Sequence, residues 1–161
     1  MYPIIITICL CFAYFALAYL FAAFFEKSAP VFGRRSIFSI TCIIVFSLVV
    51  YAVSATISDE ELSNRILHAF GGGFVSVMVC FFVVRDTRLT ISRFQFFIFS
   101  LLVVTAMGVA NEIFEFFLQN YFHFVVTRSV DDTWLDLISN LVGALIAAMP
   151  FTALVLTKKK S

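Results

Sequence analysis

Five long apolar stretches, separated by shorter polar segments, make up most of the chain. They cover about residues 3–25, 37–57, 66–84, 94–118 and 135–156. An α-helix rises about 1.5 Å per residue, so each stretch is long enough to cross the ~30 Å hydrocarbon core of a lipid bilayer. The pattern predicts an all-α fold, a polytopic membrane bundle of about five transmembrane helices.

The segments between the stretches carry most of the charge. Residues 26–36 and 85–93 are basic, and residues 58–63 are acidic. The first stretch has no Lys or Arg before it and is too long for the apolar part of a signal peptide, so we expect a retained anchor. The sequence shows no repeat and no second domain, and residues 1–161 are expected to form a single integral membrane domain.

Composition supports the membrane class and excludes some others. The chain is 62% hydrophobic and 13% charged, whereas a soluble domain is about half apolar and about a quarter charged. The net charge of +1 indicates no nucleic-acid partner, and the expected partners are membrane lipids. The four cysteines lie inside apolar stretches, away from the polar residues, which favours small membrane-helix residues over a metal or disulfide framework.

The basic residues predict how the bundle is oriented. With five spans, nine of the eleven fall on one side: Lys27, Arg34, Arg35, Arg85, Arg88, Arg93 and Lys158–Lys160. The other side holds Arg65 and Arg128. Positively charged loops stay in the cytoplasm, so this distribution places the N-terminus outside and the C-terminus in the cytoplasm.

Half of the ten acidic residues lie in or beside the last two apolar stretches. Glu112 and Glu115 are three residues apart and share a helix face. Asp132, Asp136 and Asn140 are spaced by four residues and form one polar stripe. Ionisable groups in a membrane are energetically expensive and therefore mark candidate functional sites.

The predicted topology brings these groups to one level of the membrane. The third stretch starts, the fourth ends and the fifth starts at the outer side. We therefore expect His68, Glu112, Glu115 and Asp136 to converge in one cluster, because pointing the polar faces at one another avoids exposing them to lipid.

Each candidate has a functional and a structural interpretation. His68 is either a metal ligand or proton carrier, or a histidine satisfied by an interhelical hydrogen bond. Glu112 and Glu115 are either a metal-binding or acid/base pair, or part of a buried ion-pair network with a cation such as Arg65 or Arg128.

The aspartates lie at different depths in the last predicted helix. Asp131 and Asp132 lie at a predicted helix start, where a carboxylate caps free N–H groups and meets the positive end of the helix dipole. Asp136 and Asn140 lie a turn or two deeper, so capping does not explain them. Arg128 is placed to pair with an aspartate or to bind a phosphate group.

Two functions of different classes fit this pattern. The first is a membrane protein whose outer-leaflet site binds a polar ligand or lipid head group without chemistry. The second is a membrane-embedded, metal-dependent hydrolase or transferase acting on a lipid-linked substrate. In that case a divalent metal would be held by His68, Glu112, Glu115 and Asp136. The sequence contains no nucleophile elbow, phosphate-binding glycine loop or HExxH helix, and both alternatives stay open.

Three blocks of sequence resemble the VanZ-like family of small integral membrane proteins. They are RILHAFGG at Arg65–Gly72, NEIFEF at Asn111–Phe116 and RSVDDTWLDLISNLVGA at Arg128–Ala144. The last block is especially similar to the YjdF-like branch, and Glu115, where other members often have Gln, fits that branch. Asn64 departs from the Asp usual in the family. The resemblance implies a shared outer-leaflet site, and we expect the cell membrane of a prokaryote as the location.

The topology can be tested by cysteine-accessibility labelling in a cysteine-free background. Cysteines introduced near Lys27, near Arg88 and at the C-terminus should be protected from an impermeant reagent in intact cells. Cysteines near Glu60 and His123 should react, because these loops are predicted to lie outside. Labelling of the Arg88 loop from outside would contradict the predicted orientation.

Overall fold

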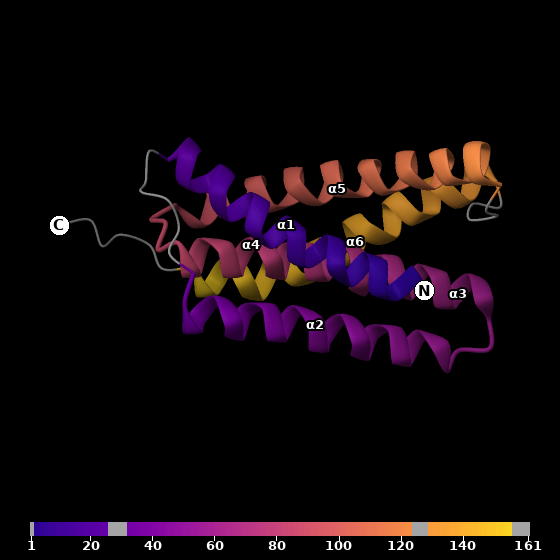
Figure 1. Cartoon of the computed structure of the whole chain (residues 1–161), viewed down its shortest axis with the longest axis horizontal. Helices are drawn as coiled ribbons and strands as arrows, with labels where there is room; N and C mark the ends of the chain where they lie inside the picture. The colour runs from indigo at the N-terminus through magenta and orange to yellow at the C-terminus, as the bar shows by residue number, and fades with distance from the viewer. Residues whose placement is uncertain (1, 26–31, 124–128, 156–161) are drawn as a thin grey trace.

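Every element in the described part of the chain is a helix. The structure is a computed structural model that describes residues 2–25, 32–123 and 129–155. In chain order the elements are α1 (Tyr2–Phe24), α2 (Arg34–Ala55), α3 (Glu60–Ile66), the π-helix η1 (Leu67–Phe74), α4 (Val75–Asp86), α5 (Arg93–Phe122) and α6 (Val130–Leu154) (Figure 1). α3, η1 and α4 are continuous, which makes five helices long and apolar enough to cross a membrane. The predicted all-α class with five spans is confirmed.

Two helices begin five or six residues before their apolar stretches. α3 begins at Glu60, six residues before the predicted span, because the carboxylate of Asp59 accepts hydrogen bonds of 3.0 Å from two backbone N–H groups of the first turn. α6 begins at Val130, five residues early, and the hydroxyl of Ser129 caps it in the same way. Capped first turns are polar, so hydropathy alone does not find them.

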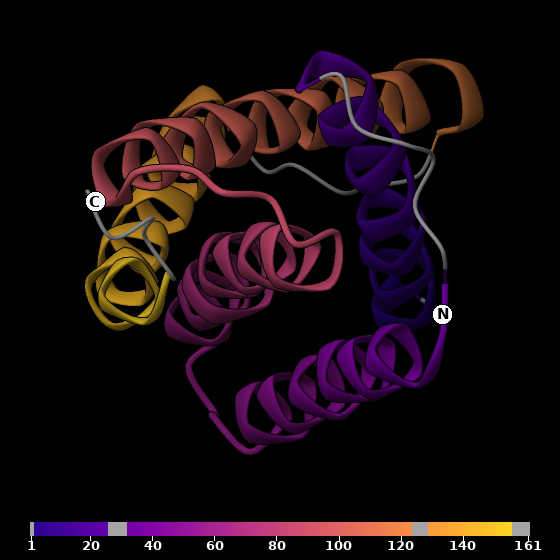
Figure 2. The ribbon, with the colours of Figure 1, turned by 90° about the vertical axis from the view of Figure 1, so that its left-hand side faces the viewer.

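The continuous α3–η1–α4 helix is the centre of the bundle. Figure 2 looks along the bundle and shows α1, α2, α5 and α6 arranged around it. Val75, Val77, Val79 and Val83 are fully buried along α4. Half of the residues in the most apolar 18-residue segment of this helix are buried, compared with less than a third in each of the other four helices.

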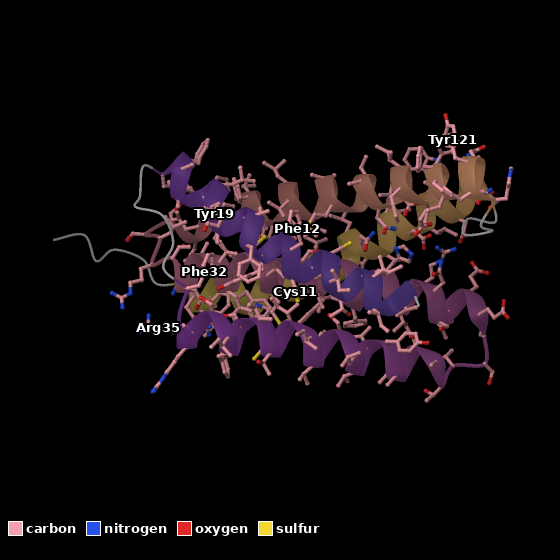
Figure 3. The ribbon with its side chains drawn as sticks, in the orientation of Figure 1. Cys11, Phe12, Tyr19, Phe32, Arg35 and Tyr121 are labelled. Carbon is pink, nitrogen blue, oxygen red and sulfur yellow. The ribbon has the colours of Figure 1, made fainter. Side chains whose placement is uncertain are left out.

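The surrounding helices present large apolar side chains to the outside. Phe12 and Tyr19 lie on the outer face of α1, and the Phe12 side chain is 73% exposed (Figure 3). Polar and amphipathic groups lie at the two ends, where Arg35 and Tyr121 point away from the bundle in opposite directions. An apolar belt with polar ends is the surface that a lipid bilayer requires.

The closest helix contact joins η1 to α6. A Cβ atom on Gly143 would lie 1.6 Å from the backbone oxygen of Ala69, and one on Gly73 would lie 2.0 Å from that of Asn140. Glycine at both positions allows the two backbones to touch, as small residues do in membrane helices. A Cβ atom on Gly72 would lie 2.1 Å from Asn140 Oδ1, whereas one on Gly71 would meet only Val50 of α2, at 3.8 Å.

A second polar cluster holds α1, α2 and α4 together at the other end of the bundle. In this Asp86 cluster, the Asp86 carboxylate accepts hydrogen bonds from Tyr14 at 2.8 Å, from Ser39 and from the neighbouring Arg85 at 2.9 Å. Arg85 also donates to the hydroxyl of Ser39 at 2.8 Å. One carboxylate and one guanidinium pair directly here, so this cluster is balanced in charge.

The η1–α6 contact predicts a large effect of one methyl group. Gly143→Ala should lower the free energy of unfolding by about 3 kcal/mol or more, because the added Cβ overlaps backbone that cannot move aside. Gly71→Ala is the matched control, because Gly71 lies in the same π-helix but faces Val50 of α2, and this change should alter the free energy of unfolding by less than about 1 kcal/mol. Reversible unfolding in mixed detergent micelles measures both, and equal effects would refute the close-contact explanation.

Candidate functional site

A buried polar cluster lies at the end of the bundle where α3 and α6 begin and α5 ends. We call it the Asp136 cluster; its members are Arg65, His68, Glu112, Glu115, Asp132, Asp136 and Asn140. They come from three separate parts of the sequence, on α3 and η1, α5, and α6. Four of them are buried: Glu112, Glu115, Asp136 and Asn140.

Arg65 is the cation of this cluster. Its guanidinium donates to the Asp132 carboxylate at 2.5 Å and to the Asp136 carboxylate, and it also reaches the backbone oxygen of Asp132 at 3.3 Å. Asn64, the preceding residue, donates to Asp136 Oδ1 at 3.1 Å. Two adjacent residues of α3 therefore hold the acidic face of α6.

His68 lies one turn further along, in η1, and both of its ring nitrogens face α6. Nε2 lies 3.3 Å from Asp136 Oδ1, and Nδ1 lies 3.5 Å from Asn140 Nδ2. π-helical turns within α-helices are frequent at functional sites. Here the π-helix carries His68 and the glycines that bring it against α6.

Glu112 differs from the other carboxylates of the cluster because neither of its oxygens accepts a hydrogen bond of normal geometry from the described residues, although its side chain is buried. The side chains of Thr133 and Asn111 are the nearby donors. One ligand atom each of His68, Glu112 and Asp136 lies within 4.8 Å of the other two. These three residues, from three helices, are the ones that could hold a metal ion in this part of the chain.

Glu115 lies next to this group and is held differently. It accepts a hydrogen bond of 2.8 Å from Asn111, one turn earlier on α5, and it interacts electrostatically with His68 and Glu112. Asp131 is exposed at the start of α6. Arg128, the remaining predicted site residue, lies outside the described residues.

A cleft of about 670 Å³ opens beside the cluster. Arg65 and Asp132 form part of its wall, together with the acidic residues Glu60, Glu61 and Asp131. The cleft therefore reaches the ion pair that covers Asp136. Asn64 also lines it.

Sequence reasoning did not assign two features that the structure shows. Asn64 was noticed only as a departure from a family pattern, yet its amide binds Asp136 directly. Arg85 and Asp86 fall in a segment that the sequence predicts as a loop, whereas they form the last turn of α4. Nothing in their spacing signals the Tyr14 and Ser39 hydroxyls that reach Asp86 from other helices.

Fold and site together define a polytopic integral membrane protein with a buried ionisable cluster at one end. The chain belongs to the family described as "Predicted membrane protein (DUF2238)", whose model matches residues 3–157. YjdF-like proteins are a DUF2238 family, so that part of the resemblance is confirmed, while the wider VanZ-like assignment stays a prediction. No curated protein and no solved structure matches the chain.

The ion pair at Arg65 predicts a stability effect. Asp136→Asn should lower the free energy of unfolding by about 3 kcal/mol, because Arg65 then keeps one carboxylate partner instead of two in a buried setting. Asp131→Asn, an exposed change on the same helix, should stay within about 0.5 kcal/mol. Unfolding in mixed micelles tests both, and an Asp136→Asn protein as stable as the parent would show that the pair is not structural.

Proposed function

We propose that this integral membrane protein binds a polar ligand that carries a positively charged amine, in the cleft beside Arg65. The observation that carries the proposal is the charge of the cleft. Its described lining holds four carboxylates, Glu60, Glu61, Asp131 and Asp132, and one guanidinium. The guanidinium is already paired with Asp132 and Asp136. The excess negative charge favours a cationic partner.

The volume of the cleft and its position near the membrane surface favour a lipid head group as the source of the amine. Its volume lies in the range of small-molecule sites, about 300–1,000 Å³. Trp134 and Tyr121 are exposed at the same end of the bundle, and such aromatic residues are enriched where the bilayer meets water. With the orientation inferred from the basic loops, the ligand belongs to the outer leaflet of a prokaryotic cell membrane.

One observation favours a second candidate function. The grouping of His68, Glu112 and Asp136 suits a membrane-embedded hydrolase or transferase that uses a metal ion on a lipid-linked substrate. Such an enzyme needs a bound divalent cation, whereas amine binding in the cleft does not. The two functions therefore respond differently to metal removal.

The amine proposal is tested by titration calorimetry on EDTA-treated protein. A short-chain lipid with an ethanolamine head group should bind more tightly than the same lipid with a glycerol head group. If free ethanolamine binds as tightly as the ethanolamine lipid, the protein recognises the amine itself and not the lipid. Equal binding of the two lipids would contradict the proposal.

Charge-neutralising variants locate the binding. Combining Glu61→Gln with Asp131→Asn should raise the Kd for the ethanolamine lipid about five-fold, since each exposed charge contributes about 0.5 kcal/mol. Arg34→Gln, an exposed change at the opposite end of the bundle, is the control and should leave the Kd unchanged. An unchanged Kd in the double variant would exclude the cleft as the site.

A further inference from the structure

We propose that His68, Glu112 and Asp136 form a binding site for one divalent transition-metal cation, with Zn²⁺ or Mn²⁺ as the fitting ions. The three residues do not line the amine cleft, and amine binding there does not require the metal, whereas the second candidate function rests on it. The inference starts from Glu112, a buried side chain whose two oxygens accept no hydrogen bond of normal geometry from the described residues, although the Asn111 and Thr133 side chains lie near it.

The Glu112 carboxylate needs a counter-ion or a proton. The residue is 9% exposed, and both oxygens are buried without a hydrogen-bond partner among the described residues. A buried polar atom left unpaired costs about 1–3 kcal/mol, and more when it is charged. Its oxygen faces a space that it shares with the His68 ring and the Asp136 carboxylate, all within 4.8 Å.

The charges around this space leave room for a divalent cation. Glu112 and Asp136 contribute two negative charges when ionised, and of these two only Asp136 forms an ion pair with Arg65 among the described contacts. The Asp86 cluster at the other end pairs one carboxylate with one guanidinium and has no such excess. Carboxylates in excess of cations inside a membrane bundle require protons or a metal ion.

The donor set indicates the kind of metal. One imidazole with two carboxylates suits Zn²⁺, Mn²⁺ or Fe²⁺ better than Mg²⁺ or Ca²⁺, which prefer oxygen ligands alone. Zn²⁺ bonds of about 2.1 Å need donors within about 4.2 Å of one another. The three ligand atoms lie within 4.8 Å, so rotamer adjustments of several tenths of an ångström would bring them onto one ion.

Asp136 can serve Arg65 and a metal at once. Its contacts with Asn64, Arg65 and His68 are all made by Oδ1, and Oδ2 is the oxygen available to a cation. Binding would replace the present contact between His68 Nε2 and Oδ1 with two bonds to the same ion. The Arg65 pair then keeps the aspartate oriented.

Asn140 is placed to position His68 for this role. A histidine that binds metal through one nitrogen usually donates its other N–H to a fixed acceptor. Asn140 lies 3.5 Å from His68 Nδ1, and its own Oδ1 is buried without a partner. The oxygen and the NH₂ group of an amide are similar in size, so the amide can turn over within the same space. Turning this amide over gives Nδ1–H its acceptor and leaves Nε2 free for the metal.

The experiment measures metal on purified protein that has been stripped with EDTA, reloaded with Zn²⁺ or Mn²⁺ and desalted. Wild type should retain about one ion per chain by plasma mass spectrometry, and bound Mn²⁺ should show a changed paramagnetic resonance spectrum. Glu112→Gln should weaken binding at least about tenfold, since even the outer partners of metal ligands contribute 10–100-fold. A wild type that holds no Zn²⁺ and no Mn²⁺ overturns the site.

Glu115→Gln is the matched control, because it makes the same chemical change one turn away on the same helix. Glu115 already has Asn111 as its partner, so this variant should keep one ion per chain. Equal loss in Glu112→Gln and Glu115→Gln would overturn the three-residue ligand set. Glu112→Gln protein that binds metal like wild type would do the same.

His68→Gln separates a metal ligand from a structural residue. Retention volume and the fluorescence of Trp134, the single tryptophan, report whether each variant is folded. Folded His68→Gln protein without metal supports the site, and folded protein with full metal overturns it. If this variant does not fold, Asn140→Leu replaces it, and an unchanged metal affinity there overturns the positioning role.

Discussion

The ion pair of Arg65 with Asp132 and Asp136 is the interaction on which this end of the bundle depends. Charged side chains inside a lipid bilayer cost several kcal/mol unless a partner meets them. Arg65 comes from α3 and both aspartates come from α6, so the pairing can form only if the two helices are in register. The pair thereby aligns the central helix with α6, and the positions of His68 and Asn140 follow from that alignment.

Close backbone packing makes the alignment possible. Gly73 and Gly143 let η1 and α6 touch, and a side chain at either position would overlap backbone of the other helix. At that separation the His68 ring reaches Asp136 and Asn140 directly. The π-helical turn and its glycines thus serve the site as well as the fold. A wider contact would leave the polar groups to face lipid or an apolar core.

The two ends of the central helix differ in how their buried charged groups are paired. At one end Asp86 is met by Arg85, Tyr14 and Ser39. At the other end the described carboxylates outnumber the cations, and Glu112 has no hydrogen-bond partner there. A satisfied cluster is explained by structure alone, since it joins three helices. The buried Glu112 carboxylate is the difference between the two ends, and for that reason both proposals concern the α3 end.

The sequence by itself determined the class, the five spans and the end at which the polar groups gather. Hydropathy and length are properties of each segment alone, and the order of the segments places His68, Glu112 and Asp136 at one level. Sequence could not decide which of these groups share a partner, because that depends on helix rotation and separation. The tertiary structure shows that Arg65 and Asn64 bind Asp136 and that Asn111 donates a hydrogen bond to Glu115. It also shows that Glu112 lies near His68 and Asp136. It also joined Tyr14 and Ser39 to Asp86, residues whose spacing carries no signal, since interhelical hydrogen bonds depend on contacts between segments far apart in the chain.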